Sequence, residues 1–271
     1  MASVDSGGVR IDYEVHGPAD GRTVLLLHGF PDSRHLWRHQ VGPLAEAGYR
    51  VVVPDQRGYG RSDKPADVAA YNLLFLAGDA IAVLDDVGAD KALVVGHDWG
   101  APVAWALATA MPDRVERLAV LSVGHPAAFG SAGLAQREKS WYMLLFQFEG
   151  VAERWMSEDG GARFREWANH PDHDDVVAAL EADGSLTSAL SWYRANVPPE
   201  SLLGPPPALP PVEVPVMGVW STGDMALTEA QMTASAEHCA NGFRYERLEG
   251  GHWIPLEQPE ALTRLLLDFF G

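Results

Sequence analysis

Residues 93–101 constrain the fold more than any other stretch of the chain. The apolar run 93–95 predicts a short buried strand, and Gly96-His97-Asp98-Trp99-Gly100 predicts a sharp turn into a helix. The two glycines flank Asp98, so such a turn presents its carboxylate at the end of the strand. A carboxylate is poorly suited to ordinary ester cleavage, but it can displace at a saturated carbon and become an alkyl ester. Aspartate also caps helices, so the stretch alone leaves both roles open.

Overall composition restricts the partners and the compartment. A formal net charge of −17 over 271 residues argues against nucleic acid or an anionic membrane as a partner. Cys239 is the only cysteine, so no intrachain disulfide forms and a cytoplasmic location is favoured. Residues 1–8 lack the basic start and apolar run of a signal peptide, and no window approaches the length of a membrane span. A monomer and a homodimer are both compatible with the sequence.

Buried strands alternate with helices through the first half of the chain. The uninterrupted apolar run 23–27 is typical of a central parallel strand that is covered on both faces. The pattern predicts strands at 9–15, 23–27, 49–53, 92–95 and 115–123, and helices at 36–47, 71–87 and 99–110. This alternation predicts an α/β fold with a mostly parallel central sheet flanked by helices.

The alternation stops after residue 124. Residues 125–212 contain no buried strand, are helical in pattern and rich in aromatic residues, and end in a proline-rich linker at 204–211. The earlier pattern then returns, with strands at 214–220 and 243–248 and helices at 228–239 and 259–270. We therefore expect a core built from 1–124 and 213–271, and a helical lid, 125–212, inserted over the strand ends.

Two further groups are placed to act with Asp98. His252 lies on the loop after the last predicted strand, where it can activate water, and Asp224 follows strand 214–220, where it can orient the imidazole. A single histidine is more often a surface or core residue, and Asp224 can also cap a helix, but both stand at strand ends. The chain order is nucleophile, acid, base, which is the order of the α/β-hydrolase arrangement.

An ester on Asp98 needs donors for the oxyanion that forms when water attacks it. The backbone N–H groups of Phe30 and Trp99 are the candidates, and Pro31 can fix the turn through a cis peptide bond. The histidines and aspartates in 170–175 suggest a metal site at first sight, but a solvated acidic loop fits them better. We expect no metal and no cofactor.

The chain resembles the epoxide hydrolases of the α/β-hydrolase fold superfamily over nearly its whole length. The motifs that carry this resemblance are His28-Gly29-Phe30-Pro31, Asp55-x-Arg57-Gly58-x-Gly60-x-Ser62, Gly96-His97-Asp98-Trp99-Gly100 and Gly251-His252-Trp253. An aspartate in the turn narrows the family to epoxide hydrolases and to dehalogenases that act on alkyl halides or haloacids.

The lid distinguishes these activities. The resemblance implies two lid tyrosines that hold and protonate the epoxide oxygen, and residues 141–147 and 191–196 supply Tyr142 and Tyr193. Each tyrosine can also be a packing residue, and Phe148-Glu149-Gly150 departs from the Pro-Gly that is frequent in the family. Haloalkane dehalogenases often have Asn where this chain has Phe30, and fluoroacetate dehalogenases usually have Arg where it has Trp99.

The expected activity is conversion of a small apolar epoxide to a vicinal diol through an alkyl ester on Asp98, which water activated by His252 then hydrolyses. One alternative is a haloalkane or haloacid dehalogenase that uses the same Asp98, His252 and Asp224. Another is a non-catalytic, ligand-binding member of the fold. The aromatic residues that we expect to line the substrate pocket are Phe30, Trp99, Trp141, Phe146, Trp192 and Trp253.

Overall fold

A computed structural model describes residues 2–182, 184–202 and 204–271. In this part of the chain an eight-stranded sheet has the order β1-β2-β4-β3-β5-β6-β7-β8. Strands β3 to β8 run parallel, and β2 pairs antiparallel with both β1 and β4. The strands are β1 (Ala2–Ser6), β2 (Val9–His16), β3 (Thr23–Leu27), β4 (Arg50–Pro54), β5 (Ala92–His97), β6 (Val115–Leu121), β7 (Val216–Ser221) and β8 (Phe243–Leu248).

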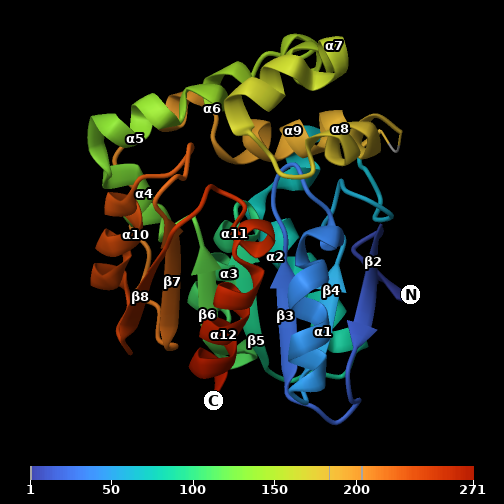
Figure 1. The fold of residues 1–271 in the computed structure, drawn as a ribbon, viewed down its shortest axis with the longest axis vertical. Coiled ribbons are helices and arrows are strands. Elements are labelled where there is room, and N and C mark those ends of the chain that lie inside the picture. The colour runs from blue at the N-terminus through green and yellow to red at the C-terminus, as the bar shows by residue number, and fades with distance from the viewer. Residues whose placement is uncertain (1, 183, 203) are drawn as a thin grey trace.

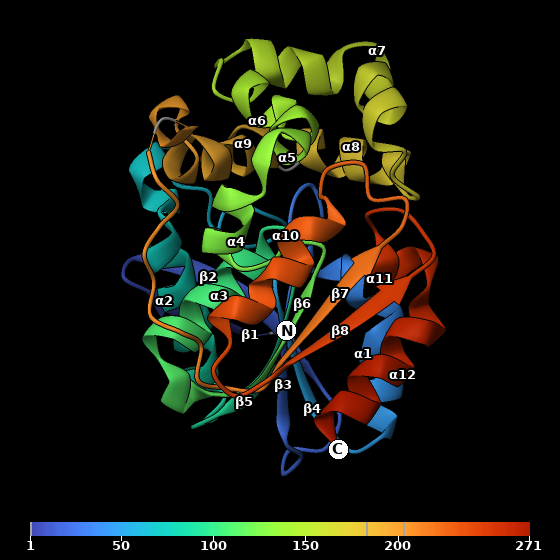
Figure 2. The ribbon, with the colours of Figure 1, turned by 90° about the vertical axis from the view of Figure 1, so that its left-hand side faces the viewer.

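Helices cover both faces of the sheet, as Figure 2 shows. On one face lie α2 (Leu73–Asp86), α3 (Gly100–Ala110) and α10 (Glu229–Ala234), and on the other α1 (Arg38–Glu46), α11 (Ile254–Glu257) and α12 (Pro259–Phe270). Every residue of β3, β5 and β7 is buried, because these strands carry apolar side chains to both layers. Short 3₁₀ helices lie at Arg34–Trp37, Val68–Tyr71, Pro112–Arg114, Pro199–Leu202 and Ser235–His238.

Six helices are inserted between β6 and β7 in the described part of the chain. They are α4 (Pro126–Ser131), α5 (Gly133–Lys139), α6 (Trp141–Leu145), α7 (Val151–Ala168), α8 (His173–Ala182) and α9 (Ser185–Asn196). In Figure 1, α5 to α9 lie together at one end of the sheet. Helix α7 is interrupted at 158–161, where the backbone leaves the helical conformation. We refer to α4–α9 as the inserted segment.

The predicted fold class is confirmed, and β3, β8 and α12 have the predicted bounds. Strand β1 was not predicted. It pairs antiparallel with β2, but its sequence, Ala-Ser-Val-Asp-Ser, offers only Val4 to the interior and lacks apolar alternation. The predicted helix 228–239 ends earlier, because α10 gives way to a 3₁₀ turn at Ser235. No helix in the described ranges combines the length and the apolar character that crossing a membrane requires.

Candidate active site

Asp98 occupies a tight turn between β5 and α3. A Cβ atom at Gly96 would overlap the backbone of Gly100, and one at Gly100 would overlap the carbonyl of Leu27, so only glycine fits at both places. Asp98 itself has a left-handed backbone, with φ of 49°. Such a conformation is costly for a residue with a side chain and persists only where its surroundings enforce it. The turn thus holds the carboxylate, 7% exposed, at the carboxyl end of β5.

The loop after β3 brings main-chain donors to this carboxylate. The N–H of Phe30 donates to Asp98 Oδ1 at 2.7 Å. A Cβ atom on Gly29 would overlap both Oδ1 and the amide nitrogen of Trp99, so this oxygen and that amide lie side by side against Gly29. The Phe30–Pro31 peptide bond is cis, as the sequence suggested. Of the two predicted oxyanion donors, the Phe30 N–H therefore donates to Asp98 Oδ1, and the Trp99 amide lies near the same oxygen.

His252 lies between two carboxylates. Its Nδ1 is 2.9 Å from Asp224 Oδ2, and its Nε2 is 3.5 Å from Asp98 Oδ2. Asp224 Oδ1 accepts hydrogen bonds from the N–H groups of Ala226 and Leu227, both at 2.9 Å, which fix this carboxylate. All three predicted groups are buried, and His252 connects the two carboxylates. In the sequence, Asp224 lies 126 positions after Asp98, and His252 lies 28 positions after Asp224.

The two carboxylates control the charge of His252. Burial alone would lower the pKa of the imidazole, but Asp224 and Asp98 outweigh burial and raise this pKa to about 10. Burial alone would likewise raise the pKa of Asp224, but His252 and the two N–H donors hold it below its usual value. His252 is therefore an imidazolium at neutral pH as long as both neighbours are ionised.

The two predicted tyrosines come from the inserted segment. Tyr142 on α6 and Tyr193 on α9 are 3% and 2% exposed, and they line one small cavity with Asp98 and His252. Burial raises the pKa of both hydroxyls well above the usual value, and the nearby Asp98 carboxylate raises it further. Both hydroxyls are therefore protonated and neutral across the physiological range.

The walls of this cavity agree with the predicted pocket only in part. Phe30 and Trp253 line it, and so do Phe164, Trp167, Met225 and Ala226, which were not predicted. Trp141 was expected to line the pocket but does not border this cavity. Its side chain is 43% exposed and packs against Trp155 and Trp167. The predicted Trp99, Phe146 and Trp192 are buried one layer behind the cavity, where their rings support Tyr193 or Trp99.

With this geometry established, the chain can be compared with known proteins. Residues 22–259 match the family described as alpha/beta hydrolase fold. The chain belongs to this family. Epoxide hydrolase A of Mycobacterium tuberculosis is 33% identical over 98% of this chain and 95% of that protein. Epoxide hydrolase 3 of Siraitia grosvenorii is 38% identical over 99% of this chain and 97% of that protein. The crystal structure of epoxide hydrolase A from Mycobacterium thermoresistibile is 31% identical, with a TM-score of 0.84 over 99% of this chain and 97% of that one.

In this α/β hydrolase, α9 is tied to the core by polar contacts. Trp192 Nε1 donates to the carbonyl of Arg57 at 3.0 Å, and Ser188 Oγ donates to that of Gly58 at 2.7 Å. One turn later, Asn196 Nδ2 donates to the carbonyl of Tyr71 at 2.8 Å. The glycine-rich motif at 55–62 thus positions the helix that carries Tyr193.

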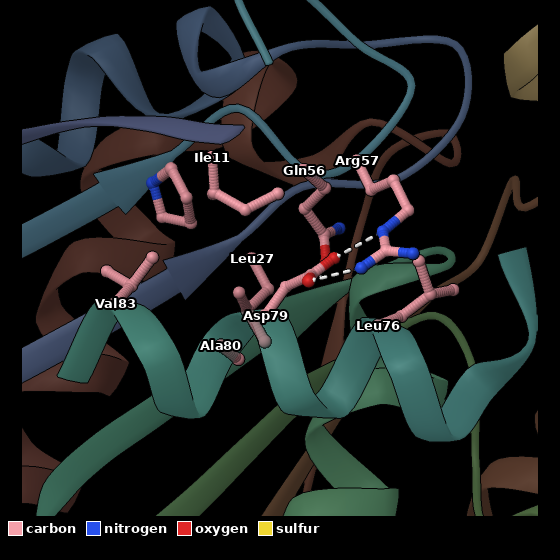
Figure 3. Close-up of a pocket in the computed structure, with 9 residues that line it drawn as sticks. Ile11, Leu27, Gln56, Arg57, Leu76, Asp79, Ala80 and Val83 are labelled. Atoms are coloured by element: carbon pink, nitrogen blue, oxygen red, sulfur yellow. Dashed lines mark hydrogen bonds and ion pairs between the residues drawn. The ribbon is translucent and has the colours of Figure 1, made fainter. Parts of the chain in front are cut away.

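A second small cavity of the α/β hydrolase lies beside Arg57 and belongs to this support. Figure 3 shows Arg57 paired with Asp79 of α2 through two bonds, of 2.8 Å from Nε and 2.6 Å from Nη2. Both side chains are buried, and the paired guanidinium fixes the backbone whose carbonyl receives Trp192. Neither Asp98 nor His252 borders this cavity.

The expectation that residues 170–175 form a solvated acidic loop is only partly right. The aspartates there are partly or fully exposed, but His170 and His173 are buried, at 4% and 2% exposure, so the loop is not simply solvated. His170 reaches Asp32 in the core, and His173 lies against Phe164. Within the ranges that the structure covers, no group of three or more His, Cys, Asp or Glu side chains is arranged to hold a metal ion.

Proposed function

We propose that this α/β hydrolase converts an epoxide to a vicinal diol through an ester on Asp98. The observation that carries the proposal is the cavity itself, which two buried tyrosines line together with a carboxylate and a carboxylate-paired histidine. An alkoxide is a poor leaving group without an acid, and buried neutral tyrosines supply that acid. Relatives named epoxide hydrolases, which the chain matches along almost its full length, support the same reaction.

In the first step Asp98 attacks a ring carbon. Oδ1 is engaged by the N–H of Phe30, so Oδ2 is the oxygen that forms the new bond. The carbon–oxygen bond of the ring breaks, its electron pair goes to the epoxide oxygen, and a hydroxyl proton from Tyr142 or Tyr193 neutralises that oxygen. The product is an alkyl ester on Asp98 that carries a free hydroxyl group.

The charge of His252 links this step to the next. The tyrosinate left behind is unstable in a buried site and takes the proton of the imidazolium. Alkylation also removes the negative charge of Asp98, one of the two carboxylates that raise the pKa of His252 to about 10. His252 thus becomes a neutral base only after the ester has formed, which orders the two steps.

In the second step the neutral His252 takes a proton from water, and the hydroxide attacks the ester carbonyl. Negative charge grows on the Oδ1 position, to which the Phe30 N–H already donates and near which the Trp99 amide lies, so these two amides are the proposed oxyanion donors. The bond between the acyl carbon and Oδ2 breaks, and Oδ2 leaves as an alkoxide. This alkoxide takes the proton of the hydroxyl group that water added to the acyl carbon, so the product is the neutral diol and Asp98 is again a carboxylate. Asp98 and the imidazolium are then restored, and the protons balance over the cycle.

The inserted segment acts as a lid in this proposal, and its cavity selects the substrate. The cavity has room for about one water molecule, so an epoxide enters only when the inserted helices move. Its walls are mainly the rings of Phe30, Phe164, Trp167 and Trp253, which favour a small apolar epoxide.

The test is a single turnover of excess enzyme with styrene oxide in heavy-oxygen water. The label is expected in the Asp98 carboxylate, found by peptide mass analysis, while the first diol carries an unlabelled oxygen from the enzyme. Label that enters the first diol directly would show that water attacks the ring and would overturn the ester.

Turnover assays with other substrates separate the alternatives. A dehalogenase would release halide from haloalkanes or haloacetates and form little diol, and a ligand-binding member of the fold would bind apolar epoxides without turnover. The geometry does not favour a halide site at Trp99, because its ring packs against Tyr193, with centroids 5.1 Å apart, and does not line the cavity.

A further inference from the structure

Three buried polar side chains from three segments meet beside the cavity. Asp32 lies on the loop after β3, and its Oδ1 is 3.2 Å from Nε2 of His170, which lies between α7 and α8. Trp253, the neighbour of His252, donates from Nε1 to the other oxygen, Oδ2, at 3.0 Å. The three are 5%, 4% and 3% exposed, so Asp32 depends on these two donors in place of water.

The backbone N–H of Asp172 determines which partner donates in the hydrogen bond between His170 and Asp32. The N–H of Asp172 donates to His170 Nδ1 at 2.9 Å, so Nδ1 carries a lone pair. The proton of the neutral ring is therefore on Nε2, and Nε2–H donates to Asp32. The inserted segment thus fixes the tautomer of its own histidine and directs the remaining N–H into the core.

We propose that His170 is a positioning residue that couples closure of the inserted segment to the alignment of the catalytic loops. This inference rests on the proposed function. The N–H of Asp32 donates to the carbonyl of Gly29 at 3.0 Å and closes the turn that presents the Phe30 amide to Asp98. The ring of His170 also lies 4.3 Å, between centroids, from that of Trp253, which borders the cavity.

Opening the inserted segment has a defined consequence under this proposal. When His170 withdraws, the Asp32 carboxylate keeps one donor of two, and a buried charge that is partly unsatisfied draws its loop toward water. The turn at 29–32 and the loop at 250–253 then relax together. Closing the segment restores both, so the oxyanion donor and the base are aligned only when the substrate is enclosed.

The test compares two substitutions of His170 with a matched surface control. His170→Phe keeps a buried ring but removes the N–H, whereas His170→Gln supplies an amide N–H near the place of Nε2. His39→Phe makes the same change at an exposed position of α1, outside the contact between His170, Asp32 and Trp253. The readouts are kcat and KM for styrene oxide, thermal unfolding, and hydrogen exchange of peptides that cover 28–33 and 250–253.

We expect His170→Phe to lose about tenfold or more in kcat/KM, the scale of one hydrogen bond to a charged group. Exchange should accelerate in both loops, His170→Gln should recover most of both effects, and His39→Phe should match the wild type. Wild-type exchange in His170→Phe, or a His170→Gln as impaired as His170→Phe, would overturn the coupling.

A second variant keeps the test valid if His170→Phe does not fold. Asp32→Asn puts an amide against two N–H donors that need acceptors, so it breaks one of the two contacts from the core side. It should accelerate exchange in the same two loops, and no acceleration would count against the coupling. A wild-type enzyme that forms no diol would refute the proposed function alone, because hydrogen exchange tests the coupling without any substrate.

Discussion

The core and the inserted segment hold their functional groups by different means. The carboxylates of Asp98 and Asp224 follow β5 and β7 and are fixed by main-chain N–H donors. Tyr142 and Tyr193 are held by rings, with Tyr142 4.6 Å from Trp167 and Tyr193 5.4 Å from Phe30 between centroids. Backbone N–H groups on the loops after the strands therefore hold the two carboxylates of the core, whereas packing between aromatic rings holds the two tyrosines of the insertion. Under the proposed function, the core thus supplies the nucleophile and the base, and the insertion supplies the acid that protonates the leaving oxygen.

The insertion is itself divided. Helix α9 is hydrogen-bonded to the core through Ser188, Trp192 and Asn196, so Tyr193 lies on a helix that is anchored to the core. Helix α6 carries Tyr142 and packs mainly against other inserted aromatic residues. We expect α9 to be the fixed wall of the cavity and α6 to move when the site opens.

The largest expected effects come from the core charges. Asp98→Ala should lower kcat by on the order of 10⁴ or more, because the nucleophile is lost. His252→Gln should also stop turnover, but at the ester stage, so the intact mass should rise by the mass of the substrate. Asp98→Ala in the same experiment should show no such increase. A His252→Gln enzyme that fails to build up the adduct from a substrate of the wild type would contradict the role of His252.

Smaller effects are expected from the hydroxyls of the insertion. Removing both, in Tyr142→Phe/Tyr193→Phe, should lower the rate of ester formation by about 10³, within the range of general acid catalysis. Each single variant keeps one donor and should lose about tenfold, with thermal stability close to that of the wild type.

The two single variants also test the division within the insertion. Because Tyr193 sits on the fixed helix, Tyr193→Phe should act mainly on kcat, whereas Tyr142→Phe should act on KM as well. Stopped-flow measurement of ester formation over a range of substrate concentrations separates these effects. Equal changes in both parameters for both variants would remove the distinction between α6 and α9.

The core was largely predictable from the sequence because its pattern is imposed by burial. Strands such as β3 and β5 are covered on both faces and therefore appear as unbroken apolar runs, and the residues that follow them must meet at one edge of the sheet. Because Asp98, Asp224 and His252 each follow a parallel strand, this rule alone predicts that they lie close together. Strand β1 was not predicted because an edge strand with a single half-buried apolar residue, Val4, has no such pattern.

The insertion was predictable as helical but not in its orientation. Trp141 and Tyr142 are neighbours in a helix that is apolar all round, yet one is 43% exposed and the other 3%. Phe164 and Trp167 share a helix face at a spacing of three residues, a signal that could have placed them on the cavity. His170 had no such signal, because its partner Asp32 lies 138 positions away in the chain.

The core site also predicts a pH dependence of stability. The pKa of His252 is raised from 6.5 to about 10 in the folded protein, so the folded state binds a proton that the unfolded state has lost between these values. The stabilisation is complete below about pH 6.5 and is lost as the pH rises toward 10. Between pH 7 and 9 the free energy of unfolding should fall by up to about 1.4 kcal/mol per pH unit.

His252→Gln supplies the control, because it removes this titration and leaves the inserted helices in place. Buried histidines with lowered pKa, such as His97 at about 4, titrate below this window, and Tyr142 and Tyr193 titrate above it. Urea unfolding at pH 7, 8 and 9 should therefore give curves that converge, with the wild type losing stability faster than the variant. Parallel curves would mean that the two carboxylates do not hold a proton on His252, and the ordering of the two chemical steps would lose its basis.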